Sequence, residues 1–433
     1  MRTTKQLKIV LLFGLVVMAA CSNDSLQAPN NPDILQGNGD RITVENDAAV
    51  LAQRVSRANV PLKIETLDLP VMAMSRNDHG RGSEQDGPVF KLFLVASVAP
   101  PVVGDVTLQA THIAVRGNNA IVSYNVQGPL RAGGVDVFNI RHVDDVELVS
   151  QAVFEDTDVS AIDLWNTKLY MAEATSDGAF MTPAVLETIN VWGGKLADET
   201  ERVDLASYAG TGVVAKRDNV FVTSGDLGGG LTVFDRNTME LKYFRNVPDA
   251  RAVDTHRDEV VVMKGTPGAI HIFDRESGDL KRVYESGGAT IPESKSTVEV
   301  ARGRIWYAAG EEGVRVLRYR DGKVLGGIPV PDIDGVDPEN EVTNAVSLHG
   351  RLIFIANGGA GLLVARASSD VEAGSNDEDG VDDNEADWDL SFQVLGNVVF
   401  PGGESANFVG GKGNLVFVAT GTGGLHIIKI VHE

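Results

Sequence analysis

The sequence predicts an all-β protein built from repeats, and three observations support this prediction. Apolar residues alternate over short stretches and are mostly Val, Ile, Leu and Phe, with 47 glycines in the chain. Beyond the N-terminal apolar run, helical spacing of apolar residues is found only at 47–59. Finally, one hairpin pattern of apolar strand, glycine-rich turn and apolar strand recurs along the chain. Its clearest copies include NVFVTSGDLGGGLTVFD from Asn219 and NLVFVATGTGGLHIIKI from Asn414.

The N-terminal stretch 1–20 differs in kind from the rest of the chain. A basic start with Arg2, Lys5 and Lys8 precedes the apolar run IVLLFGLVVMAA, and Cys21, the single cysteine, follows it. The run is too short for a transmembrane helix, so residues 1–20 are predicted to be a cleaved signal peptide.

The position of Cys21 resembles that of the lipidated cysteine in bacterial lipoprotein signals, because Ala19 and Ala20 precede it. This resemblance implies a lipid anchor at Cys21 and a cell-envelope location. Ser22 favours outer-membrane sorting, facing either the periplasm or the surface. The alternative is an ordinary cleaved signal followed by a chance cysteine.

The segment after the signal and the overall charge each support one further prediction. Residues 21–90 are rich in Asn, Asp, Gly and Pro and are predicted to be a flexible tether. The chain carries a formal charge of −22, which becomes about −25 when the three cationic residues of the signal are removed. Phosphate binding needs clustered Lys and Arg, so this balance argues against nucleic acid as a partner.

The hairpin spacing predicts a closed ring of sheets over residues 91–433. Seven hairpins begin near residues 121, 169, 220, 260, 305, 352 and 415, at steps typical of units that supply four strands each. A single four-stranded sheet cannot bury both faces, whereas seven sheets packed around an axis can. The prediction is therefore a seven-bladed β-propeller. The seventh unit has only three strands, so the stretch Lys91 to Ala99 is predicted to close the ring by completing that blade.

The repeats resemble the LVIVD repeat of bacterial β-propellers. GGLTVFD at 229–235 and AIHIFD at 269–274 carry the resemblance, which covers residues 91–433. It implies the fold but no particular activity, because propellers host many chemistries. The repeat also has an aspartate early in its first strand, where this sequence has Ala252, Thr297, Asn344 and Asn407.

An acidic insertion at 368–389 falls between the last two strands of the sixth blade. Its residues Asp377, Asp379 and Asp383 stand in an order similar to that of an EF-hand calcium loop, with Gly380 at the turn. Ala386 stands where such a loop has its bidentate glutamate. Calcium is therefore a possible ligand, and the alternative is a solvated acidic loop.

No nucleophile, metal-protease or nucleotide-binding motif occurs, so no catalytic residue is predicted. The favoured function is a non-catalytic, monomeric binding platform for a protein or glycan. Its binding face is expected where irregular loops gather, as at 172–184, 285–297 and 330–344. The alternative is a metal-dependent hydrolase or lactonase-like enzyme that uses Glu299, Asn344 and Asn407. Candidate residues of the binding face are Arg251, Glu299, Glu311, Asn344, Asn357 and Asn407.

Overall fold

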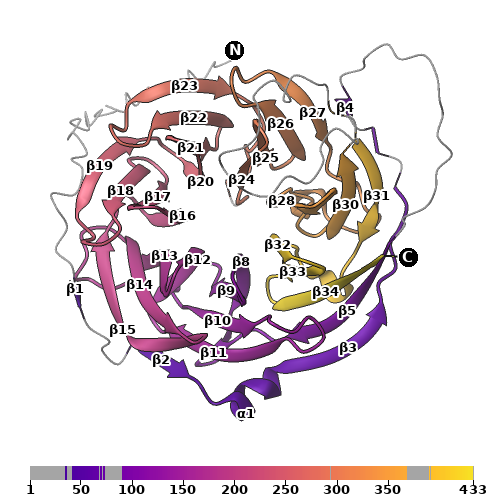
Figure 1. Ribbon diagram of the computed structural model, residues 1–433, viewed down its shortest axis with the longest axis horizontal. Coiled ribbons are helices and arrows are strands. Elements are labelled where there is room, and N and C mark those ends of the chain that lie inside the picture. The colour runs from indigo at the N-terminus through magenta and orange to yellow at the C-terminus, as the bar shows by residue number, and fades with distance from the viewer. Residues whose placement is uncertain are drawn as a thin grey trace, which may run out of the picture.

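Seven antiparallel sheets stand around a common axis in the computed structural model, as Figure 1 shows. The structure describes residues 35–36, 41–67, 69–70, 72–73, 90–292, 294–367, 390 and 392–432. Each sheet has four strands placed side by side from the axis to the rim, in chain order in six of the seven sheets, and some sheets carry one more strand at the rim. The predicted seven-bladed β-propeller is confirmed.

The first three blades follow each other directly along the chain. From the axis outward, their strands are β8 (Gln109–Arg116), β9 (Asn119–Asn125), β10 (Gly133–Asn139) and β11 (Glu147–Phe154) in blade 1; β12 (Thr157–Trp165), β13 (Lys168–Thr175), β14 (Ala184–Trp192) and β15 (Lys195–Asp204) in blade 2; and β16 (Ala209–Lys216), β17 (Asn219–Gly225), β18 (Gly230–Asp235) and β19 (Leu241–Asn246) in blade 3.

The next three blades repeat the same order. Their strands are β20 (Ala250–His256), β21 (Glu259–Lys264), β22 (Ala269–Asp274) and β23 (Leu280–Glu285) in blade 4; β24 (Val298–Ala301), β25 (Arg304–Ala308), β26 (Val314–Arg318) and β27 (Val324–Ile328) in blade 5; and β28 (Ala345–His349), β29 (Leu352–Ala356), β30 (Leu362–Ala367) and β31 (Phe392–Val398) in blade 6. The connecting loops hold the short hairpin β6 (Val102–Val103) and β7 (Val106–Thr107), and the 3₁₀ turns η2 (Pro338–Asn340) and η4 (Pro401–Gly403).

Blade 7 joins the two parts of the chain and closes the ring. It takes β32 (Phe408–Lys412), β33 (Leu415–Ala419) and β34 (Leu425–His432) from the C-terminal part, and its fourth strand is β5 (Phe90–Val98). The β5–β34 pairing runs from Val98 opposite Leu425 to Phe90 opposite His432. The predicted closure is confirmed, with the strand starting one residue earlier than expected.

The segment predicted to be a flexible tether is ordered in its described part. We call the described residues between 35 and 73 the N-terminal belt, because they follow the outer rim of five blades. Their strands and their partners are β1 (Leu35–Gln36) on β15, β2 (Ile42–Glu45) on β11, β3 (Val55–Pro61) on β5 and β4 (Met72–Ala73) on β27, with Glu65 bridged to Asn397 of blade 6. The indigo strands β2 and β3 are visible along the lower rim in Figure 1.

Edge pairing and apolar packing explain why the belt is ordered. The outer strand of a blade has unpaired backbone groups, and a further strand satisfies them. A short helix, α1 (Ala48–Leu51), capped by Asp47, and the turn η1 (Ala52–Arg54) place Leu51 in the core between blades 7 and 1. Leu62 and Ile64 pack against the core between blades 6 and 7. The helical spacing at 47–59 is thus helix only in part, since Val55 begins a strand.

The cores lie between neighbouring blades. Both faces of each sheet are covered, so strands such as β17 and β29 are buried at every position. Within the described part of the chain, no helix has the length and apolar character needed to cross a membrane.

Candidate functional site

Three carboxylates occupy matching positions on the inner strands of the ring. Asp163 in β12 lies opposite Tyr170, Asp254 in β20 opposite Val261, and Glu299 in β24 opposite Trp306. The three partners match because each is the third residue of the second strand of its blade. All three side chains are half-exposed by surface area. They therefore lie at the inner edge of the ring, where water reaches part of each side chain.

Each of these carboxylates accepts a backbone hydrogen bond from the next blade. Asp163 accepts from Ala215 at 2.8 Å, and Asp254 accepts from Val300 at 2.7 Å. Glu299 accepts from the amide of Leu348 at 3.2 Å. The innermost strand of a blade has no further strand beside it, so these amides need side-chain acceptors. The carboxylates thus link consecutive blades.

The enclosure of these groups shifts their pKa values upward. Burial raises the pKa of Glu299 to about 8 and that of Asp254 to about 6, and for Glu299 the nearby negative charge of Asp254 adds to the effect. Solvent reaches only part of each side chain, and the surrounding protein removes most of its hydration. This loss of hydration is the largest cause of the raised pKa values. Within the described residues, no group of three or more His, Cys, Asp and Glu side chains could hold a metal ion.

Lys295 crosses the axis of the ring. Its Nζ donates to the carbonyl of Ser160 at 2.8 Å, which joins the loop before blade 5 to blade 2 on the other side. Burial lowers the pKa of Lys295 to about 8. His112 lies near it against Phe408, with ring centroids 4.0 Å apart, and burial, followed by the charge of Lys295, lowers the pKa of His112 well below its usual value.

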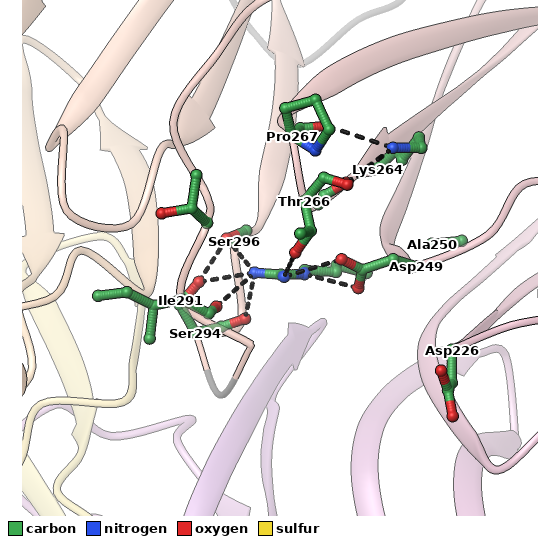
Figure 2. A network of polar contacts seen from close by, with 12 residues as sticks. Asp226, Asp249, Ala250, Lys264, Thr266, Pro267, Ile291, Ser294 and Ser296 are labelled. Atoms are coloured by element: carbon green, nitrogen blue, oxygen red, sulfur yellow. Dashed lines mark hydrogen bonds and ion pairs between the residues drawn. The ribbon is translucent and has the colours of Figure 1, made fainter. Parts of the chain in front are cut away.

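Arg251, a candidate residue of the binding face, is held by seven hydrogen bonds. Figure 2 labels its partners Asp249, Thr266 and Ser294. Its guanidinium contacts both carboxylate oxygens of Asp249 at 2.9 Å and Thr266 at 3.1 Å. On the other side it donates to Ile291, Ser294 and Ser296, at 2.9 to 3.3 Å. Arg251 is buried, and these bonds fasten the loop 286–297 to blade 4.

The predicted asparagines also connect the blades. Asn344 donates from Nδ2 to the carbonyl of Ala406 at 3.3 Å, and Asn407 makes the same bond to Ala110 at 3.1 Å. The side chain of Asn357 accepts from Thr343 at 2.6 Å within blade 6. The amides of Asn344 and Asn407 thus link neighbouring blades, whereas Nδ2 of Asn357 is buried without a hydrogen-bond partner among the described residues.

Of the other predicted residues, Glu311 accepts from the amide of Thr290 at 3.1 Å and so holds the loop before blade 5. Glu299, Asn344 and Asn407, expected together at a metal, are each engaged in a separate contact between neighbouring blades. The predicted lipidation residue Cys21 and the predicted calcium ligands Asp377, Asp379 and Asp383 lie outside the described residues.

The residues that sequence reasoning missed are charged side chains inside otherwise apolar strands. Glu173 in KLYMAEA and Glu187 in AVLETINVW are fully buried and lie near Arg41 of the belt. Asp254 stands beyond Ala252, the position at which the repeat pattern has an aspartate. The signal that could have found these residues is a carboxylate within a run of apolar residues, because such a position is expected to be buried.

Apolar side chains gather on the loops at one end of blades 1 to 3. Met181 is 89% exposed, Leu227 82%, Tyr208 52% and Leu130 49%. All four lie on turns between second and third strands or on loops between blades, which are on the same face of an antiparallel ring. We call these four residues the loop-face patch.

Contacts between the loops show that the loops carrying the patch lie side by side. Arg131, next to Leu130, stacks over the ring of Tyr208 at 4.6 Å. Ser207, next to Tyr208, donates to the carbonyl of Leu227 at 3.3 Å. The amide of Met181 donates to Asp204 at 3.2 Å, at the start of the loop that carries Tyr208.

Comparison with known proteins adds little to this description. No family model matches the sequence, and no curated protein matches it. Solved structures do match, among them the computationally designed Ika8 protein. That match has 12% sequence identity and a TM-score of 0.43, and it covers 86% of this chain and 100% of the designed chain. A similarity this low carries no argument about function.

Proposed function

We propose that this chain is a lipid-anchored protein of the cell envelope whose propeller binds a protein partner, without catalysis, through the loop-face patch. The observation that carries the proposal is the exposure of four large apolar side chains on adjacent loops of blades 1 to 3. A contiguous exposed apolar patch on a folded protein marks an interaction site.

The polar candidates support a binding role over a catalytic one. The hydrogen bonds of four candidates connect loops and blades to each other: those of Arg251, Asn344, Asn407 and Glu299. Catalysis by a carboxylate or an amide would need such groups to converge on a substrate with free donors and acceptors.

The chemistry of the patch favours a protein over a glycan. Leu130, Met181 and Leu227 are aliphatic, whereas Tyr208 is the one aromatic residue of the four and is already covered on one side by Arg131. Asp226, which is exposed, adds negative charge beside Leu227. A complementary partner would present apolar side chains flanked by Lys or Arg.

The anchor is the second half of the proposal. Cys21 follows two small residues after an apolar run, and the strongly acidic chain suits an envelope exterior rather than an anionic membrane surface. The lipid would hold the propeller at the outer membrane, and the belt begins at Leu35, 14 residues beyond Cys21. The propeller would act as a monomer.

Photo-crosslinking in cells tests the binding site, and fatty-acid labelling tests the anchor. A photoreactive residue at Met181 or Leu227 should give a discrete protein adduct, whereas the same residue at Val324, on the outer strand of blade 5, should not. Labelled fatty acid should enter the wild type and be absent from Cys21→Ser. Equal adducts from the patch and from Val324 would overturn the binding site, and labelled Cys21→Ser would overturn the anchor.

A further inference from the structure

Two belt arginines meet carboxylates at matching places in blades 1 and 2. Asp136 on β10 lies opposite Val122, the fourth residue of β9. Glu187 on β14 lies opposite Met171, the fourth residue of β13 in the next blade. Arg54 forks onto the two oxygens of Asp136 at 2.9 and 2.7 Å. Arg41 makes the corresponding bond to Glu187 in blade 2.

Among the side chains that differ between the two sites, one removes a hydrogen-bond donor. In blade 1 the hydroxyl of Tyr124 donates to Asp136 at 2.7 Å. Tyr124 is two residues beyond Val122 in β9, and the residue two beyond Met171 in β13 is Glu173. A tyrosine hydroxyl always offers a donor at neutral pH, whereas an ionised carboxylate only accepts.

The carboxyl groups of Glu173 and Glu187 consequently have no donor for several of their oxygens. Both side chains are 0% exposed. Neither oxygen of Glu173 has a hydrogen-bond donor within reach, and the same is true of Oε2 of Glu187. The two groups are close enough to hydrogen-bond each other, but two ionised carboxylates cannot do so. One proton between them supplies the missing donor.

The surrounding charges point the same way. The charged groups that face Glu173 and its partner come from the belt, the blade 1–2 loop, the turn after β13, and strands β14 and β15: Arg41, Asp156, Asp177, Glu187 and Arg202. Arg41 also bonds Asp156 at 3.2 Å, and Arg202, whose charge acts on Glu173, bonds Asp177 at 2.8 Å. The two guanidinium groups are thus shared with other carboxylates, which leaves an excess of negative charge if Glu173 ionises.

We propose that Glu173 and Glu187 form a proton-binding site that locks the N-terminal belt and blade 2 together while the proton is bound. The shared proton takes the place that the Tyr124 hydroxyl has in blade 1. When the proton leaves, two adjacent buried carboxylates repel each other, and the seam between Arg41, β13 and β14 loosens.

The expected pH dependence follows from the environment of Glu173. Burial, together with the charge of Glu187, raises the pKa of Glu173 well above its usual value of 4.5, although Arg41 and Arg202 oppose the shift. A group whose pKa is raised by folding gives its full stabilisation below the unfolded value. That stabilisation is lost as pH rises from about 4.5 through the raised pKa.

Glu173→Gln tests the proposal because glutamine keeps the shape and always carries a donor. The denaturation midpoint of the wild type should fall as pH rises from mildly acidic to alkaline, and the fall should be clearly smaller in Glu173→Gln. Tyr124→Phe is the matched control, since it should lower the midpoint by the same amount at each pH. Parallel profiles for the wild type and Glu173→Gln would overturn the proposal.

A direct readout leaves Glu173 and Glu187 unsubstituted. With ¹³C in the glutamate side chains, Glu173 should give a carboxyl resonance that titrates far above the ordinary range. Glu299 should give another because its pKa is also raised, to about 8, so Glu299→Gln is used to assign the two. Loss of every such resonance in Glu299→Gln would show that Glu173 holds no proton near neutral pH and would overturn the proposal.

Discussion

The rim of the ring has two regions, one covered by the N-terminal belt and one without it. The belt follows blades 2, 1, 7, 6 and 5 and pairs with the outer strands of four of them. Blades 3 and 4 end at β19 and β23, with which no described residue of another strand pairs on the outer side. In Figure 1 these two strands form the upper left of the rim.

The two regions solve the problem of open sheet edges in different ways. On the belt side, an added strand takes up the backbone groups, and side chains such as Leu51, which is buried, fill the seams. On the other side, β23 carries charges, with Lys281 paired to Asp274 at 2.9 Å and Arg282 bonded to Glu259. Charged side chains on an edge strand discourage pairing with another chain. The belt region therefore depends on apolar burial, and the bare region depends on charge.

Removing the belt should have the largest effect. Deletion of residues 1–89 leaves β5 in place but uncovers the rim of five blades and the seams that Leu51, Leu62 and Ile64 fill. Leu51 is fully buried, and burial of a leucine side chain contributes about 1.5–3 kcal/mol, whereas Leu62 and Ile64 are partly buried and contribute less. The denaturation midpoint should fall strongly, whereas deletion of residues 1–34 should change it little. Equal midpoints for both deletions would mean that the segment is only a tether.

A single belt contact should have an intermediate effect. Arg54→Met removes the cation from Asp136, which is fully buried, and breaking a buried pair in this way costs about 3–5 kcal/mol. Arg57→Met is the control within the belt. Its pair with Asp145 is exposed, at 54% and 62% for the two side chains, so its loss should cost under about 1 kcal/mol. Equal losses from denaturant unfolding of the two variants would contradict the buried role of Arg54.

Substitutions on the bare rim should have the smallest effect. Leu280 and Val283 on β23 are 54% and 38% exposed, so Leu280→Lys and Val283→Lys should shift the free energy of unfolding by no more than about 0.5 kcal/mol. Sedimentation at high concentration should show an unchanged monomer. A large loss of stability would reveal that this edge is covered after all, and the contrast between the two regions would fail.

The repeats could be predicted from the sequence because their signal is local. Hairpins such as NVFVTSGDLGGGLTVFD contain the alternation, the turn and the closing strand within one short stretch of chain. The count of seven and the missing fourth strand at the C-terminal end also predicted that Lys91 to Ala99 would pair with β34. The hairpins follow from chain chemistry that acts within one unit, whereas the closure followed from counting the units and finding that the last one lacks a strand.

The belt and the carboxyl pair could not be predicted because neither has a local signal. Residues 41–67 mix polar and apolar side chains without a repeat, and they become strands because open blade edges lie beside them. Glu173 and Glu187 lie on two different strands of blade 2, and Arg41 is far from both along the chain. The sequence by itself determined the blades and their closure, whereas only the tertiary structure decided which buried charges meet, because contacts between elements distant in the chain depend on how the whole ring closes.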